Sequence, residues 1–204
     1  MRQDAANNRA AIVTATRQLL TTEGPGISMR TIAKAASVGV ATATRHFPER
    51  IELLDAVSAQ ASADIAAIIE AHSGEFASDA RTAWRTTVHS IGTLQLATLA
   101  QAIYEDAMRD PETRKQKDRI IDKRAQELTG IYDKLLIPAK KAHLCPESLN
   151  ALDFHMGLGI ITRPIPIEPK PSLAPDALTP RLIDLMLDGL EAHCLLYTSP
   201  SPRD

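Results

Sequence analysis

The chain has 204 residues, of which 44% are hydrophobic, 24% charged and 3% aromatic. This balance is typical of a folded globular protein, and few aromatics with many alanines favour helices over sheets. Its two cysteines, Cys145 and Cys194, have no spacing of a disulfide framework or metal site. The N-terminus lacks a secretory signal, and no apolar run reaches the roughly 18 residues that span a bilayer. We therefore expect a cytoplasmic all-α protein without cofactor, metal or membrane.

Charge is unevenly distributed along the chain. Residues 1–54 carry seven lysines and arginines against four acids, a net charge of +3, whereas the remaining residues carry a net charge of −5. A small basic segment on an acidic body predicts that only the N-terminal part meets a polyanion.

Three helices and the start of a fourth are predicted in this basic segment. Helical periodicity begins at Asn7 or Asn8 and continues to Glu23. Ser28 is a suitable N-cap for a short second helix over 29–36, and a turn at 37–39 leads to a third helix over 40–47. Pro48 opens a fourth helix to about residue 72. Two short helices joined by a tight turn and braced on both sides predict a helix-turn-helix unit.

The rest of the chain predicts four further helices, over residues 79–108, 111–136, 146–163 and 179–193. Six prolines between residues 164 and 180 predict a loop there. The final segment, 195–204, breaks the helical pattern with serines and prolines, and we interpret it as a non-native tail. The predicted domains are therefore 1–54, 55–194 and this tail.

The stretch "SMRTIAKAASVGVATATRHFPERIELLDAV" resembles the DNA-binding head of the TetR family of transcriptional regulators, and the resemblance covers roughly residues 9–57. It implies an N-terminal three-helix helix-turn-helix head followed by a helical domain for ligand binding and dimerisation. The positions that stay in register with the family motif are Ile32, Ala33, Ala36, Val38, Thr42, His46, Phe47, Leu53 and Leu54.

Four residues depart from the family pattern inside the motif. Ser37 replaces the usual turn glycine, which predicts a left-handed serine at a cost of about 1 kcal/mol. Ala41 replaces a glycine and Ala43 a leucine, which reduces packing under the third helix. Thr44 replaces a tyrosine that in the family commonly reaches a phosphate.

The third helix is expected to read DNA. Helical spacing turns Val40, Ala43 and Phe47 inward and leaves a face of small and hydroxyl side chains that can approach a major groove. Ser28 at a helix start can hold a phosphate, Arg30 matches a family position that reaches a base, and Arg50 is expected to anchor a phosphate. The predicted DNA-contacting residues are Ser28, Arg30, Ala41, Thr42, Thr44, Arg45, His46 and Arg50.

The resemblance also implies an effector site and a dimer face in the body. An apolar site needs a few polar groups, and the candidates are Trp84, His89, Tyr104, Met108 and His155. Gly157 and Gly159 would allow two copies to approach closely. An apolar stripe on the last helix needs a partner surface, in a second copy or within the same subunit; it consists of Leu182, Leu185, Met186 and Leu190.

Together these features predict a homodimeric transcriptional regulator, in this family most often a repressor, that binds a palindromic operator and is released by a small molecule. The alternative is a helix-turn-helix factor for DNA architecture or protein interaction without an effector. A helical enzyme is disfavoured because no catalytic set converges: His143 and Cys145 lie two residues apart, and Glu105 and Asp106 diverge on a helix.

Overall fold

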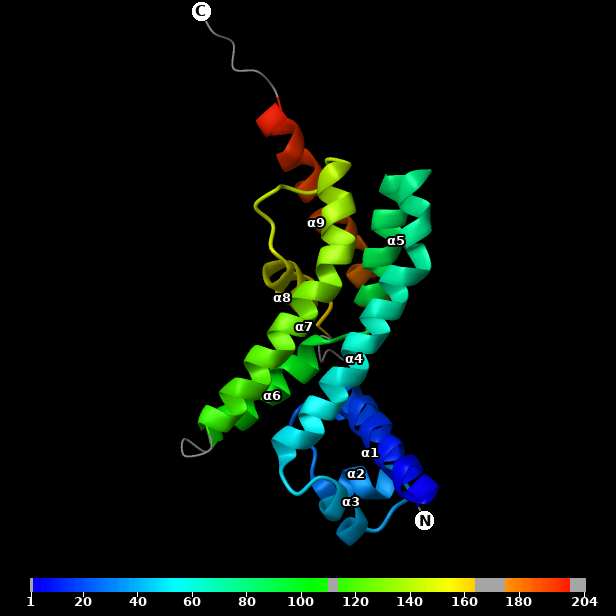
Figure 1. Cartoon of the computed structure of the whole chain (residues 1–204), viewed down its shortest axis with the longest axis vertical. Helices are drawn as coiled ribbons and strands as arrows, with labels where there is room; N and C mark the ends of the chain where they lie inside the picture. The colour runs from blue at the N-terminus through cyan, green and yellow to red at the C-terminus, as the bar shows by residue number, and fades with distance from the viewer. Residues whose placement is uncertain (1, 110–113, 164–174, 199–204) are drawn as a thin grey trace, which may run out of the picture. The chain divides into compact units, whose positions relative to one another are not determined.

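The computed structural model describes residues 2–109, 114–163 and 175–198. Every regular element among them is a helix, and none of these helices is both long and apolar enough to cross a lipid bilayer. The chain order, coloured from blue to red in Figure 1, is α1 (Arg2–Glu23), α2 (Met29–Ala35), α3 (Val40–His46), α4 (Arg50–Ser73), the 3₁₀ turn η1 (Gly74–Ala77), α5 (Ala80–Gly92), α6 (Ala97–Arg109), α7 (Arg114–Lys141), α8 (Ala151–Ile161) and α9 (Pro175–Thr198).

The chain forms two compact units. Unit 1 consists of Met1–Ala61 and Leu96–Arg124 and therefore joins α1, α2 and α3 to α6. One hydrophobic cluster holds this unit together, and Ala102 of α6 lies in it beside the residues of the first four helices. The fully buried members, with at most 2% exposure, are Leu20, Ile12, Ile32, Ala33, Ala43, Phe47, Leu53, Leu54, Val57 and Ala102.

Unit 2 consists of Ser62–Gln95 and Ala125–Asp204, and its core is partly aromatic. Trp84 of α5 and Tyr132 of α7 are both fully buried. Phe154 of α8 contacts each of them, with ring centroids 5.3 Å from Trp84 and 5.7 Å from Tyr132. Such large buried side chains contribute about 1.5–3 kcal/mol each and fix α5, α7 and α8 around one centre.

The predicted single helix over residues 79–108 is wrong, because the structure breaks it into α5 and α6. Gly92 ends α5, and a Cβ placed on it would lie 2.6 Å from Cδ1 of Ile183, so α9 packs directly on the glycine. The chain then turns through residues 93–96, where Gln95 adopts a left-handed φ of 49°. The helical periodicity of this segment does not indicate the break.

Pro138 and Pro175 lie within helices of the structure, although the sequence predicts non-helical segments at both. The predicted end of α7 near Leu136 is wrong, since the helix continues through Pro138 to Lys141. A proline inside a helix removes one backbone hydrogen bond, and here Leu135 and Ala139, both fully buried, offset the loss. The last helix begins at Pro175 rather than at the predicted residue 179, so it occupies part of the predicted loop. Residues 164–174 of that loop lie outside the described residues, as does Pro111.

Smaller differences concern where helices begin. The first helix extends back to Arg2, before the predicted Asn7 or Asn8. The helix predicted over 146–163 begins only at Ala151, because Oδ1 of Asn150 accepts a hydrogen bond from the Asp153 N–H at 2.9 Å and caps it. The predicted tail 195–204 is described only to Thr198, within α9.

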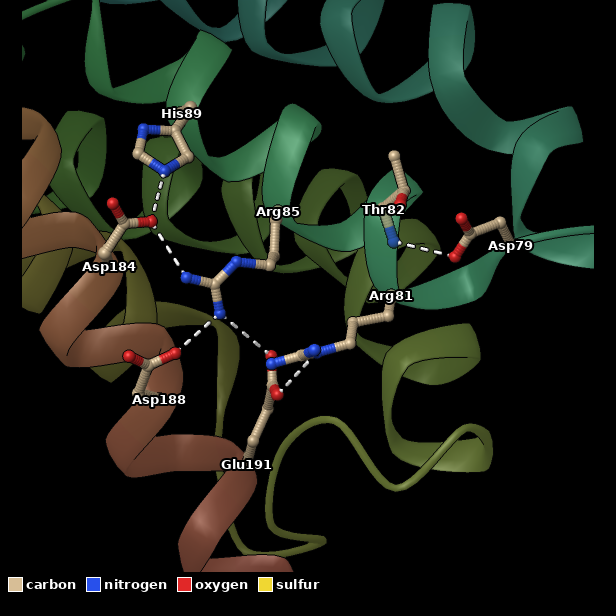
Figure 2. A network of polar contacts seen from close by, with 8 residues as sticks. All are labelled: Asp79, Arg81, Thr82, Arg85, His89, Asp184, Asp188 and Glu191. Atoms are coloured by element: carbon tan, nitrogen blue, oxygen red, sulfur yellow. Dashed lines mark hydrogen bonds and ion pairs between the residues drawn. The ribbon is translucent and has the colours of Figure 1, made fainter.

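A charged network joins α5 to α9 in unit 2 (Figure 2). Arg85 projects from α5 toward three carboxylates spaced along α9: its Nη2 donates to Asp184 at 2.8 Å and its Nη1 to Asp188 at 2.8 Å and Glu191 at 3.2 Å. Arg81 adds a bond to Glu191 at 2.9 Å, and Nε2 of His89 lies 2.9 Å from Oδ1 of Asp184. The hydrogen bond to His89, and then those to Arg85, lower the pKa of the Asp184 carboxyl against the opposing effect of burial.

Arg85→Ala is expected to destabilise unit 2 by about 1–2 kcal/mol, because charge-assisted hydrogen bonds are lost and three carboxylates are left on one face of α9. Stability conferred by a lowered carboxyl pKa is present above the ordinary value of 3.8 and is lost as the pH falls through the lowered value. The difference in unfolding free energy from the wild type should therefore be present at pH 7 and shrink in acid. Urea titrations at several pH values measure it, and an equal difference at all pH values would contradict this account.

Candidate nucleic-acid interface

A capped helix begins the helix-turn-helix unit. Oγ of Ser28 accepts a hydrogen bond from the Thr31 N–H at 3.1 Å and lies 2.9 Å from the Thr31 hydroxyl, which makes Ser28 the N-cap of α2. This cap confirms the predicted start of the second helix. The Ser28 side chain is exposed and its oxygen already serves the helix, so any phosphate contact would use its O–H and nearby backbone amides.

The turn after α2 is a Schellman motif. The N–H of Val38 donates to Ala33 O at 3.0 Å and the N–H of Ser37 donates to Lys34 O at 3.1 Å, which is the 6→1 and 5→2 pattern of that motif. Ser37 occupies its left-handed position with φ 56°. The predicted left-handed serine is confirmed, and the turn geometry is kept without glycine.

Ser37→Gly is expected to stabilise the protein by about 0.5–1 kcal/mol. Glycine removes the left-handed penalty of about 1–2 kcal/mol, and its larger unfolded-state entropy takes back about 0.4–1 kcal/mol. A rise of a few degrees in Tm, measured by circular dichroism, checks this result, with Ala67→Gly at an exposed position inside α4 as a control that should lower Tm. A lower Tm for Ser37→Gly would contradict it.

Helix α3 has a buried side and an exposed side. Gly39 is its N-cap, with φ −67° and ψ 145°. Ala43 and Phe47 are fully buried, as predicted, and the Arg9 guanidinium lies 4.7 Å from the Phe47 ring centroid. The predicted burial of Val40 is wrong, because this side chain is 46% exposed at the first position of the helix. Val40 directly follows the N-cap Gly39, at the end of the helix.

The remaining residues predicted on this surface lie as follows. Thr42 and His46 are partly exposed, and Arg30 is exposed in the first turn of α2. The exposed residues of α3 are Val40, Ala41, Thr44 and Arg45. Helix α3 therefore offers small side chains, two hydroxyls and one cation on the side opposite its buried residues, which suits close approach to a base-pair edge.

Arg50, the residue that the sequence predicts as a phosphate anchor, makes hydrogen bonds within its own unit. Its Nη1 donates to Ile27 O and its Nη2 to Pro25 O, both at 2.7 Å, and its Nε lies 4.0 Å from Oδ1 of Asp106. Two of the guanidinium nitrogens thus bind the loop between α1 and α2. The sequence could not reveal this role, because the partner atoms are backbone carbonyls and a residue far along the chain.

The five residues predicted for an effector site are divided between the two units. Tyr104 and Met108 lie on α6 in unit 1 and are 64% and 48% exposed, whereas the others lie in unit 2. Of these, His89 belongs to the network of Figure 2 and Trp84 is fully buried. His155 places Nδ1 3.0 Å from the Tyr132 hydroxyl.

The aromatic centre of unit 2 combines apolar rings with polar atoms. Burial lowers the pKa of His155 and raises the pKa of Tyr132, so both side chains are neutral at pH 7. Trp84 Nε1 is buried and has no hydrogen-bond partner within the part of the chain that the structure describes. A buried N–H without an acceptor costs about 1–3 kcal/mol, so this atom is poised to bind an acceptor.

A capped short helix, a Schellman turn and a second short helix with an exposed polar face form a helix-turn-helix unit, a motif whose second helix enters the major groove in DNA-binding proteins. Residues 12–57, which span this unit, match the family described as bacterial regulatory proteins, tetR family. The N-terminal part of the chain therefore contains a DNA-binding domain of the tetR family.

Solved structures share the fold over nearly the whole chain. A TetR transcription regulatory protein from Mycobacterium vanbaalenii is 21% identical with a TM-score of 0.53, covering 93% of this chain and 98% of its own. A TetR transcriptional regulator from Streptomyces coelicolor is 23% identical with a TM-score of 0.53 (89% and 97%). The TetR-family regulator PfmR from Thermus thermophilus is 19% identical with a TM-score of 0.53 (89% and 97%). No curated protein matched the chain.

Proposed function

We propose that this protein is a ligand-responsive transcriptional repressor that binds palindromic operator DNA as a homodimer. The observation that carries the proposal is the exposed face of α3, held by the buried Ala43 and Phe47 and presented after a defined turn. A helix so anchored can enter the major groove as a rigid element. Arg45 is the base- or phosphate-contacting cation of this face, and Thr42 and Thr44 supply hydroxyls and methyl groups.

A second copy of the chain is the proposed partner of α8. Leu152, Met156 and Ile160 recur every four residues on this helix and are 37%, 51% and 69% exposed. Among the described residues, no atom would contact a Cβ added at Gly157 or Gly159. An apolar stripe beside open glycines favours close packing of two identical helices, with exposed Leu185 of α9 extending the surface. Two copies would then read half-sites about 34 Å apart or somewhat more.

The direct test is selection of bound duplexes from a random pool, followed by affinity measurements at several salt concentrations. We expect an inverted repeat and an affinity that falls steeply with salt, because phosphate contacts release counterions. Failure to select any duplex would refute DNA binding. A screen for small molecules that release the selected duplex then separates a regulator from an architectural factor, which no small molecule would release.

The proposed effector is an apolar small molecule with one hydrogen-bond acceptor, bound beside Trp84. The unpartnered Trp84 Nε1 supports a donor role, and Phe154 and neutral His155 supply apolar and polar surroundings. Linkage then requires that the molecule bind the non-operator state more tightly than the operator-bound state.

Trp84→Phe is expected to weaken binding of a releasing molecule by about 3- to 10-fold, the worth of one hydrogen bond, and to leave operator affinity unchanged. Phenylalanine keeps the ring contact with Phe154 but has no N–H to donate. Trp84 is the single tryptophan of the chain, so its fluorescence in the wild type reports directly on binding at this position. Equal affinity of the variant, measured by calorimetry, would remove Trp84 from the effector site.

A further inference from the structure

Asp106 is a buried carboxylate on a helix that belongs to the DNA-binding unit. Asp106 is 7% exposed. One turn earlier on α6, Ala102 is 2% exposed and belongs to the hydrophobic cluster of unit 1. Leu99 and Ile103 of the same helix pack against that cluster. Helix α6 is therefore docked on the helix-turn-helix unit by an apolar face with a carboxylate at its edge, and a buried carboxylate requires a compensating cation.

Arg50 supplies this cation and connects α6 to the loop before α2. Its Nε lies 4.0 Å from Oδ1 of Asp106, while its two terminal nitrogens donate to the carbonyl oxygens of Pro25 and Ile27, both at 2.7 Å. A planar guanidinium binds in three directions at once, which the single ammonium of lysine does not reproduce. One side chain thus ties together α6, the first turn of α4 and the loop between α1 and α2.

The loop that Arg50 holds leads directly into the reading elements. Ile27, which is buried, is followed by Ser28, the N-cap of α2. Because α2 and α3 are joined by a tight Schellman turn, a displacement of this loop would be transmitted to α3.

We propose that Arg50 is a positioning residue for DNA recognition, which sets the orientation of α2 and α3 through the loop carbonyls and takes its own position from Asp106. This inference rests on the proposed DNA binding. It assigns Arg50 an internal role in place of a phosphate contact, and it makes buried Asp106, which cannot reach DNA, a determinant of operator affinity.

A purely electrostatic effect on DNA and the positioning of Arg50 by Asp106 predict opposite results for Asp106→Asn. If charges on this unit act only through their field on DNA, removal of a negative charge strengthens binding. If Asp106 positions Arg50, the same change releases the guanidinium and weakens binding. Glu105→Gln is the matched control, because it removes an equal charge from the adjacent residue, whose carboxylate bonds only Gln101 of its own helix among the interactions described, at 2.8 Å.

The experiment measures the affinity of full-length variants for the selected duplex, at a temperature where melting curves show each to be folded. We expect Asp106→Asn and Arg50→Lys each to weaken binding by about 3- to 30-fold, and Glu105→Gln to bind as well as the wild type or slightly better. The double variant should lose less than the product of the single losses, because both changes break one connection.

Wild-type affinity of Arg50→Lys would overturn the inference, because lysine preserves a phosphate contact but not the two hydrogen bonds to the loop. Unchanged or tighter binding of Asp106→Asn would overturn it as well. If Asp106→Asn does not fold, Arg50→Lys decides alone on the same criterion. Failure of the wild type to bind any duplex would instead refute the proposed function.

Discussion

Arg45→Ala is expected to weaken binding to the selected operator by about 10- to 100-fold, because a specific arginine contact to a base is worth about 1–3 kcal/mol. Arg45 is exposed on α3, opposite the buried Ala43 and Phe47, so its removal leaves the core intact. The expected melting temperature is therefore that of the wild type. Fluorescence anisotropy with the selected duplex, and with a scrambled duplex of the same length, measures both specific and non-specific affinity.

Arg181→Ala is the matched control for this prediction. Arg181 is an exposed arginine on α9 in unit 2, so its loss changes the net charge by the same amount outside the proposed interface. We expect this control to leave specific affinity almost unchanged. Equal affinity of Arg45→Ala for the best site would overturn the assignment of α3 as the recognition helix, and an equal loss in both variants would indicate a general charge effect.

Local signals in the sequence were sufficient for the caps and the turn of the helix-turn-helix unit. Ser28 and Gly39 cap their helices through atoms within a few residues, and the left-handed Ser37 follows from its place in a short turn. Capping and turn chemistry depend on neighbours in the chain, so the sequence contains what is needed to predict them.

Features that depend on distant residues were not predictable in the same way. The end of α5 lies where Ile183 packs on Gly92, and the continuation of α7 through Pro138 is accompanied by burial of its neighbours. Arg50 has the position of a phosphate anchor in the sequence, but backbone carbonyls of another segment hold its guanidinium. Periodicity and motif register describe one segment at a time, whereas these outcomes are set by what packs against it.

Contacts between α3 and DNA stay predictions for a related reason. The structure gives the exposure of Thr42, Thr44 and Arg45, which shows that these side chains are accessible. Which base each one meets depends on the partner duplex and on the spacing of two heads, and both are properties of a complex rather than of one chain.

Ile160→Asp is expected to convert the proposed dimer to a monomer and to lower operator affinity by at least about 100-fold. The side chain is 69% exposed on α8, so the substitution should not disturb the core of the subunit. In a dimer the same position would be buried twice, and an unpaired carboxylate in an apolar interface is strongly unfavourable. A monomer binds one half-site without the effective concentration that a linked second head provides, which accounts for the size of the loss.

Ile137→Asp provides the control, because it places the same charge at another isoleucine of unit 2 that is 65% exposed, on α7 and outside the α8 stripe. Sedimentation equilibrium should give a dimer for the wild type and for Ile137→Asp, and a monomer for Ile160→Asp. A wild-type monomer would contradict the homodimer itself, whereas a dimeric Ile160→Asp would move the interface away from α8. The stripe recurs every four residues, so Met156→Asp should behave like Ile160→Asp if α8 packs against its copy along its whole length. A normal dimer in the Met156→Asp variant would confine the contact to the end of the helix.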